Sequence, residues 1–304
     1  MKENLLIILG PTGIGKTLLS IEIAKKFNGE IIGADSMQIY KGFDIGTGKV
    51  TKEEMEEIPH HLIDFLEPKA EFSVEDFRNL AKEKIRDINS RGKLPIMVGG
   101  TGLYINSIVY DFSMQKIEKD DDYRKYLDDY IDENGLESLY EKMVSLDPKL
   151  EDNIHPNNRH RIIRAMEILN SGEKKETENF RRENDDYNLF MIGLNTDREV
   201  LYDRINRRVD MMMDEGFLEE VKRLYSMGID ENFQSMKAIG YREMLMYLKG
   251  EVELSYAIDK MKQFSRNYAK RQLTWFRRDE RIRWFDPLNE DRKEIFEEIE
   301  RKFF

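Results

Sequence analysis

The sequence predicts an α/β fold with a doubly wound parallel sheet, and two observations support this class. Short apolar runs recur along the chain without a clean alternation of apolar and polar residues, which is typical of strands buried on both faces of a parallel sheet. Helical patterns separate most of these runs, and alternation of strand and helix indicates a doubly wound sheet. The predicted strands are residues 5–9, 30–34, 61–65, 94–98 and 189–194, and the clearest helices between them are residues 18–27 and 74–90.

The rest of the chain has a helical pattern. Apolar side chains in residues 112–186 follow helical spacing, for example at Leu139, Tyr140 and Met143, and predict an inserted all-helical domain. Because residues 189–194 return to the sheet, residues 1–111 and 187–304 are predicted to form one P-loop-type core flanked by helices. The C-terminal region is predicted to be helical over residues 198–215, 217–227, 239–249 and 252–276, with glycines between the helices.

Composition limits the classes of function. The 304 residues are 40% hydrophobic, carry a formal net charge of −11 and include no cysteine. This composition indicates a folded protein and excludes a disulfide scaffold, a cysteine nucleophile and cysteine-ligated zinc. No apolar run approaches the roughly 20 residues that cross a bilayer. We therefore expect a cytoplasmic protein with no membrane contact. Separately, we expect a monomer, which no sequence pattern indicates.

The charge is distributed unevenly. Residues 260–283 contain nine Lys or Arg against two Asp or Glu, a net charge of +7 in an acidic chain. Lys262, Arg266 and Lys270 recur at every fourth residue and would share one helix face. Two interpretations are open for this segment: a solvated surface helix, or a binding surface for an anionic partner.

Residues Gly10 to Thr17 match the pattern G-x-x-x-x-G-K-[ST] between a predicted strand and a predicted helix, the context that a P-loop requires. The glycines let backbone N–H groups surround a diphosphate, the helix N-terminus favours negative charge and the lysine adds a positive one. The Thr17 hydroxyl is a candidate ligand for Mg²⁺. The motif does not distinguish ATP from another diphosphate. The predicted diphosphate-binding residues are Gly10, Thr12, Gly13, Ile14, Gly15, Lys16 and Thr17.

Polar residues follow the other predicted strands, at the edge where ligands bind in such sheets. Asp35 has three possible roles, as a Mg²⁺ ligand, a general base or a helix cap. Thr101, between glycines, is either a ligand contact or part of a tight turn. Arg204 and Arg208 share a helix face, where they either close over a diphosphate or form surface ion pairs. The four histidines lack the spacing of metal ligands, so no zinc site is expected.

Several motifs occur together in the order of one known family. The chain resembles the tRNA dimethylallyltransferases, also called isopentenyltransferases, over residues 10–277. The P-loop alone is unspecific, but the Asp-Ser-Met-Gln-Ile-Tyr, Gly-Gly-Thr-Gly and Gln-Leu-Thr-Trp blocks together are specific to this family. The matching stretches are Gly10–Thr17, Gly33–Tyr40, Gly46–Lys49, His60–Asp64, Val98–Tyr104, His155–Asn157, Arg161–Met166, Ala238–Arg242 and Arg271–Arg277.

The resemblance implies a reaction and a set of roles. The donor is dimethylallyl diphosphate, and the acceptor is the exocyclic N6 amine of the adenosine 3′ of the anticodon in tRNA. Asp35 is then the general base, and Thr101 and Arg208 contact the pyrophosphate. The implied tRNA contacts are Asp35, Ser36, Met37, Gln38, Arg159, His160, Arg161, Ile162, Ile163, Gly240, Tyr241, Arg242, Arg271, Gln272, Thr274 and Arg277.

Other functions compete with this one. A small-molecule kinase would hold ATP in the P-loop, and a related isopentenyltransferase would modify free adenine nucleotides. A nucleotide-switched RNA-binding protein would bind tRNA and leave its adenosine unmodified. The basic segment 260–283 and the block Arg271–Arg277 favour a polynucleotide acceptor.

Overall fold

The computed structural model describes residues 2–111, 120–171 and 182–304. Within these residues the central element is a six-stranded sheet in which neighbouring strands are parallel, in the order β3-β2-β4-β1-β5-β6. The α/β class predicted from the sequence is therefore confirmed. The strands are β1 (Glu3–Leu9), β2 (Gly29–Ala34), β3 (His60–His61), β4 (Leu94–Gly99), β5 (Tyr187–Leu194) and β6 (Ile282–Phe285).

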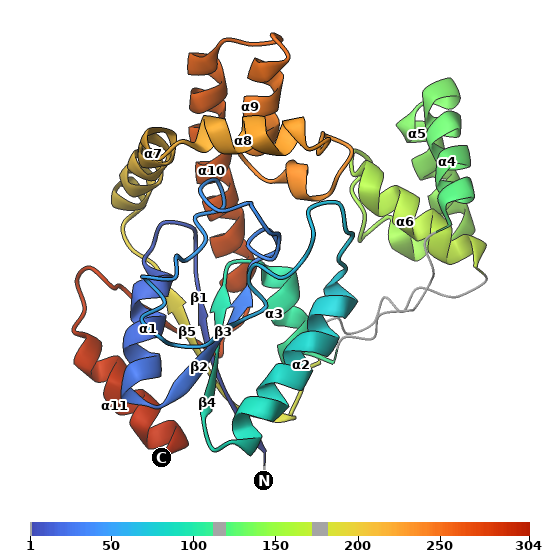
Figure 1. The fold of residues 1–304 in the computed structure, drawn as a ribbon. Helices are drawn as coiled ribbons and strands as arrows, with labels where there is room; N and C mark the ends of the chain where they lie inside the picture. The colour runs from blue at the N-terminus through green and yellow to red at the C-terminus, as the bar shows by residue number, and fades with distance from the viewer. Residues whose placement is uncertain (1, 112–119, 172–181) are drawn as a thin grey trace. The chain divides into compact units, whose positions relative to one another are not determined.

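Helices cover both faces of the sheet, which explains why its strands are apolar without alternation. All five residues of Leu5–Leu9 in β1 are fully buried. Leu6 and Ile8 share a core cluster with two helices on one face, α1 and α11, and Figure 1 shows α2 and α3 on the other face. These helices are α1 (Lys16–Lys26), α2 (Val74–Ser90), α3 (Gly102–Val109) and α11 (Arg292–Phe303).

The strand order brings three loops together. Strand β4 lies between β1 and β2, with Gly99 in register with both Leu9 and Ala34. A Cβ at Gly99 would lie 2.1 Å from the carbonyl oxygen of Ala34, so this close approach requires glycine. The loops that follow β1, β4 and β2 therefore leave the sheet side by side, at the edge where ligands bind.

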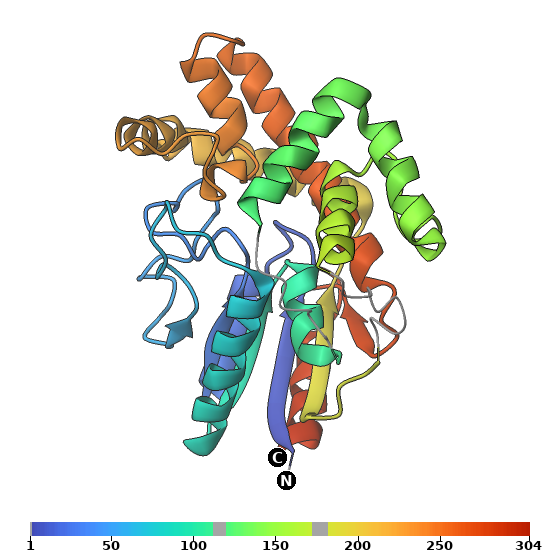
Figure 2. The ribbon, with the colours of Figure 1, turned by 90° about the vertical axis from the view of Figure 1, so that its right-hand side faces the viewer.

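The C-terminal helices lie beyond this same edge (Figure 2). The longest, α10, runs for 23 residues and reaches the loops of the sheet with its last turns. The predicted helices of this region are confirmed with small shifts at their ends. They are α7 (Arg198–Asp214), α8 (Phe217–Ser226), α9 (Tyr241–Leu248) and α10 (Leu254–Phe276), with a 3-10 turn η2 (Ser235–Lys237) before α9.

Two predictions about the sheet were wrong. The predicted strand 61–65 is reduced to the pair His60–His61, because Leu62 and Asp64 adopt positive φ values of 58° and 54° and turn the chain away. The region after residue 197 is not only helical, since β6 pairs with β5. Strand β6 has only four residues, and Arg283 interrupts its apolar side chains, so it gave no apolar run to detect.

The chain divides into two compact units, Met1–Val109 with Glu183–Phe304, and Tyr110–Arg182. In the second unit, helices are the only regular secondary structure that the described residues form. Their apolar faces meet in a core that includes Leu127, Leu139, Met143 and Ile162. The start of the predicted insertion, residue 112, lies outside the described residues. The helices are α4 (Asp121–Asn134), α5 (Leu136–Leu146), a 3-10 turn η1 (Pro148–Leu150) and α6 (Arg159–Asn170).

A buried carboxylate ties together elements around the start of β2. Glu30 accepts hydrogen bonds from Arg91 on both of its oxygens, from Lys93 Nζ at 2.7 Å and from His61 Nε2 at 2.8 Å. The arginine is the main cause that holds the pKa of Glu30 well below its usual range, against the opposing effect of burial. The ionised form of Glu30 therefore stabilises the fold.

We expect Glu30→Gln to lower the free energy of unfolding at neutral pH by about 1–3 kcal/mol, because the buried carboxylate loses its charge-assisted hydrogen bonds with Arg91 and Lys93. The folded-state pKa of Glu30 is depressed, so its stabilising effect is complete above the unfolded value near 4.5 and is lost as the pH falls below it. Urea unfolding across this pH range should show that the free energies of unfolding of the wild type and the variant become more similar as the pH falls.

The matched control is Glu67→Gln, which removes an exposed ion pair with Lys41. We expect this change to cost less than about 1 kcal/mol. A Glu30→Gln difference that stays constant as the pH falls would contradict the assigned role.

Candidate active site

The loop between β1 and α1 has the backbone geometry of a phosphate-binding loop. Gly10, Gly13 and Gly15 have φ values of 149°, 77° and 106°, a region that favours glycine. Gly15 is the N-cap of α1 and has no side chain to cap the helix, so the first N–H groups of the helix are left for a ligand. Ile14 is buried in the core, so it can serve a ligand only through its backbone.

Lys16 lies at the centre of the charges in this site. Its ammonium donates to the carbonyl oxygens of Gly10 at 2.9 Å and Pro11 at 2.8 Å. Burial lowers the pKa of Lys16 to about 8; Asp35 opposes this shift and Arg208 adds to it. The structure therefore brings together Lys16, Asp35 and Arg208, which were predicted separately from three parts of the sequence.

The loops after β2 and β4 are hydrogen-bonded to each other. The Thr101 N–H donates to Ala34 O at 3.2 Å, and the Ser36 N–H donates to Thr101 Oγ1 at 3.1 Å. Asp35 accepts from the N–H groups of Met37 at 2.9 Å and Gln38 at 3.4 Å, both on Oδ1. Asp35 thus holds its own turn in place with Oδ1. Its Oδ2 has no hydrogen-bond partner among the described residues and is available to a ligand.

The three arginines of α7 have different partners. The guanidinium of Arg204 donates to Gly13 O at 2.9 Å, and Arg207 pairs with Asp203 at 2.7 Å. Arg208 lies against Gly48, where a Cβ would come within 1.6 Å of its Nη2 atom. Burial lowers the pKa of Arg208, and Asp35 opposes that shift. Arg208 is therefore the arginine whose charge faces Asp35 and Lys16.

A buried glutamate that the sequence did not single out fixes the loop beside Arg208. Glu220 is 6% exposed and accepts from the backbone N–H groups of Asp44, Ile45 and Gly46 and from the Tyr241 hydroxyl. The Gln38 amide also donates to the oxygens of Thr47 and Gly48. In the sequence, Glu220 resembles any polar residue of an amphipathic helix, so no local signal marked it.

The residues predicted to contact tRNA divide into exposed and buried groups. Gln272 is 5% exposed, and Tyr241 and Ile162 are fully buried. Each of these three side chains packs inside its own unit, so the structure gives no support to direct RNA contacts by them. Arg159 pairs with Asp128 at the surface. The exposed members are Arg159, His160, Arg161, Arg242, Arg271, Thr274 and Arg277, and Ser36, Met37, Gln38 and Ile163 are half-buried.

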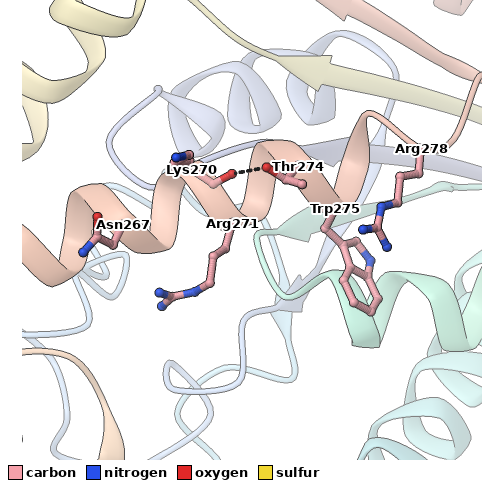
Figure 3. A pocket seen from close by; sticks show the side chains of 6 residues that line it. All are labelled: Asn267, Lys270, Arg271, Thr274, Trp275 and Arg278. Atoms are coloured by element: carbon pink, nitrogen blue, oxygen red, sulfur yellow. Dashed lines mark hydrogen bonds between the residues drawn. The ribbon is translucent and has the colours of Figure 1, made fainter. Parts of the chain in front are cut away.

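A basic cavity of about 470 Å³ lies along the last turns of α10 (Figure 3). The Arg271 guanidinium lies 5.6 Å from the centre of the Tyr268 ring. The indole Nε1 atom of Trp275 is buried without a hydrogen-bond partner in the described residues. Positive charge beside an aromatic ring suits a single-stranded nucleic acid. The lining residues are Asn267, Lys270, Arg271, Thr274, Trp275 and Arg278.

The predicted basic stripe does not act as one surface. Lys262 pairs with Asp210 at 2.5 Å, and Arg266 donates to the side chain of Asn206 at 2.5 Å, both on α7. Lys270 alone of the three lines the cavity. The four-residue spacing correctly placed the three cations on one side of the helix, but α7 covers the first two.

The site suits a metal ion that is held mainly by a bound diphosphate and by few protein side chains. Among the described residues, no group of three or more His, Asp or Glu side chains lies in position to hold a metal ion. Thr17 is exposed at the start of α1. Mg²⁺ commonly uses one or two protein ligands with substrate phosphates and several waters, so Thr17 and a bound diphosphate fit this ion.

No helix in the described residues has the length and hydropathy of a membrane span.

Comparison with known proteins identifies similar chains. The family described as IPP transferase matches residues 38–279. A tRNA dimethylallyltransferase of Halalkalibacterium halodurans is 51% identical over 294 residues, 96% of this chain and 93% of that protein. The crystal structure of the tRNA isopentenylpyrophosphate transferase from Bacillus halodurans is 49% identical, with a TM-score of 0.75, over 99% of this chain and 97% of that one. A eukaryotic dimethylallyltransferase described as acting on tRNA is 32% identical, with a TM-score of 0.80, over 98% of this chain and 77% of that one.

The lowered pKa of Lys16 predicts a pH dependence of diphosphate binding. Above a pKa of about 8 the ammonium loses its proton, so the affinity for inorganic pyrophosphate decreases as the pH rises through that value. Lys16→Arg keeps its charge, and dividing the two affinities cancels the titration of the ligand itself. From one pH unit below the pKa to one above it, we expect the wild-type affinity relative to the variant to fall about tenfold. Calorimetry would measure this, and a ratio independent of pH would refute it.

Proposed function

This chain belongs to the IPP transferase family, and we propose that it transfers a dimethylallyl group from dimethylallyl diphosphate to tRNA. The acceptor is the exocyclic N6 amine of the adenosine 3′ of the anticodon, and pyrophosphate is released. The observation that carries the proposal is the charge interaction among three side chains. Lys16 and Asp35 follow β1 and β2, and Arg208 of α7 lies close enough to interact with both. An anion site beside a carboxylate suits a reaction that expels a diphosphate and removes a proton. The monomeric state and the cytoplasmic location stay predictions.

Asp35 is the general base of this proposal. The adenine amine is a poor nucleophile because its lone pair is delocalised into the ring. As the new C–N bond forms and the allylic C–O bond breaks, the amine proton passes to Asp35 Oδ2. The hydrogen bonds from Met37 and Gln38 to Oδ1 hold the carboxylate in one orientation.

The P-loop receives the leaving group. Negative charge accumulates on the pyrophosphate as the C–O bond breaks, and fixed positive groups stabilise this charge without reorganising. The backbone N–H groups of the loop, Lys16 and Arg208 supply those groups, and Thr101 contacts the same oxygens from the loop after β4. Mg²⁺ bound through Thr17 would add charge neutralisation on the diphosphate.

The basic cavity on α10 supports an RNA acceptor. Lys270, Arg271 and Arg278 line it with Trp275, a combination that binds backbone phosphates and unstacked bases. The adenosine must leave its stack to reach a buried reacting carbon, as in other enzymes that modify bases. A kinase, or an enzyme that modifies free nucleotides, has no need of this cavity.

A mass measurement on tRNA tests the proposal. Unmodified tRNA incubated with the protein, Mg²⁺ and dimethylallyl diphosphate should gain one dimethylallyl group on the adenosine 3′ of the anticodon. Transfer to AMP instead of tRNA would select the free-nucleotide enzyme. ATP turnover without transfer would select the kinase.

In the same assay, Asp35→Asn should lower turnover by about 10²-fold or more, within the usual range for a lost general base. The affinity for tRNA should stay near that of the wild type, since the substitution keeps the shape of the side chain. Turnover near the wild-type rate would eliminate Asp35 as the base.

Neutralising the cavity should change the salt dependence of tRNA binding. For Lys270→Ala with Arg271→Ala, the slope of log affinity against log salt should become shallower by about 1.4 to 1.8, the value for two lost phosphate contacts. Lys262→Ala with Arg266→Ala is the matched pair, because both cations already have partners on α7. We expect a smaller change there. An equal effect of the two pairs would place the RNA over the whole stripe.

A further inference from the structure

One buried amide on α10 bridges two loops of the active site. Gln272 Oε1 accepts the backbone N–H of Thr12 at 3.1 Å, and its Nε2 donates to the carbonyl oxygen of Gly100 at 2.9 Å. Thr12 lies in the loop after β1, and Gly100 lies in the loop after β4. The side chain is 5% exposed. A single residue from the far end of the sequence therefore connects the phosphate-binding loop to the loop that carries Thr101.

The contact is specific to an amide. A buried polar group costs free energy unless its hydrogen bonds are satisfied, and here one end of the side chain must accept while the other donates. The group of Thr12 that meets the amide is its N–H and that of Gly100 is its carbonyl oxygen, so the two partners fix which way the amide points. The fit is also close, since a Cβ on Gly100 would lie 2.1 Å from Gln272 Nε2.

The connection extends to the third loop. Thr101 follows Gly100 and accepts the N–H of Ser36, the residue after Asp35. The hydroxyl of Tyr268, one turn before Gln272 on α10, lies near the side chains of both Thr101 and Gln272. The last turns of α10 thus hold the loops after β1 and β4 directly, and reach the loop after β2 through Thr101.

One face of α10 is exposed and lines the basic cavity, and the other is buried against the loops of the sheet. Arg271 and Thr274 are exposed and line the basic cavity, whereas Gln272 between them points into the protein. The Thr12 N–H is taken up by Gln272, so it is the following N–H groups, from Gly13 onward, that are left for a diphosphate.

We infer that Gln272 is a positioning residue for the diphosphate, not a reader of RNA. It holds the phosphate-binding loop and the Gly100–Thr101 loop at the separation that a diphosphate requires, from the buried face of the RNA-binding helix. This inference rests on the proposed function for its substrates, but its test needs only inorganic pyrophosphate and an anticodon stem-loop RNA.

The test compares Gln272→Met with Gln263→Met. Methionine is close to glutamine in length and makes neither strong hydrogen bond. Gln263 lies on the same helix and is exposed, where its side chain accepts from Lys260. Three quantities are measured for each variant: the Kd for pyrophosphate with Mg²⁺, the Kd for the stem-loop RNA, and the Tm.

We expect Gln272→Met to weaken pyrophosphate binding about tenfold or more, since two buried backbone groups lose their partner. RNA affinity should stay at the wild-type value, and Gln263→Met should leave both affinities unchanged. Weakened RNA binding with intact pyrophosphate binding would overturn the inference and make Gln272 an RNA contact. Unchanged pyrophosphate binding would also overturn it.

A second variant keeps the test decisive if Gln272→Met does not fold. Gly100→Ala leaves the glutamine in place but displaces its amide by steric contact, so the same selective loss of pyrophosphate affinity is expected. Pyrophosphate affinity at the wild-type value in Gly100→Ala would overturn the inference. Failure of the proposed function is a separate result, because it appears as absent transfer by the wild type.

Discussion

The position of β4 between β1 and β2 determines where the candidate catalytic groups of this protein lie. Parallel strands present their carboxyl ends at one edge, so the order of the strands decides which loops are neighbours. Here the loop of Lys16 and the loop of Asp35 are separated by the loop of Thr101. The close backbone approach at Gly99 brings the loops of Asp35 and Thr101 within hydrogen-bonding distance of each other. The remaining parts of the site, from α7 and α10, are built onto this arrangement.

The site holds an excess of positive charge before any substrate binds. Lys16 and Arg208 each have a pKa lowered by burial, and Asp35 opposes both shifts. A site that contains two half-buried cations and one carboxylate gains from an incoming anion, because the anion satisfies charge that the protein holds at a cost.

The parts that could be predicted from the sequence are those with a local pattern. Strands β1, β2, β4 and β5 produce apolar runs because they are buried on both faces, and the phosphate-binding loop has its glycines in a fixed order. Strand β6 was missed, since a short edge strand with Arg283 has no comparable pattern. Helix α11 was not among the predicted helices either. Gln272 and Glu220 were not assigned their roles because those roles depend on residues far away in the sequence. A buried glutamine and an exposed one look alike in a helical pattern until the fold shows what each contacts.

The pairing of basic side chains on α10 also limits the size of the proposed RNA contact. The +7 charge of residues 260–283 suggests a long basic surface, but Lys262 and Arg266 are held by α7, and Arg283 lies among Glu290, Glu294 and Glu298. The cations around the cavity run from Lys270 to Arg278, a distance of about 12 Å at 1.5 Å per helical residue. With an axial rise of about 3.4 Å per nucleotide in a stacked strand, this length matches roughly four nucleotides. A footprint of that size suits the turn of a small hairpin loop and is too short to follow a full turn of a double helix.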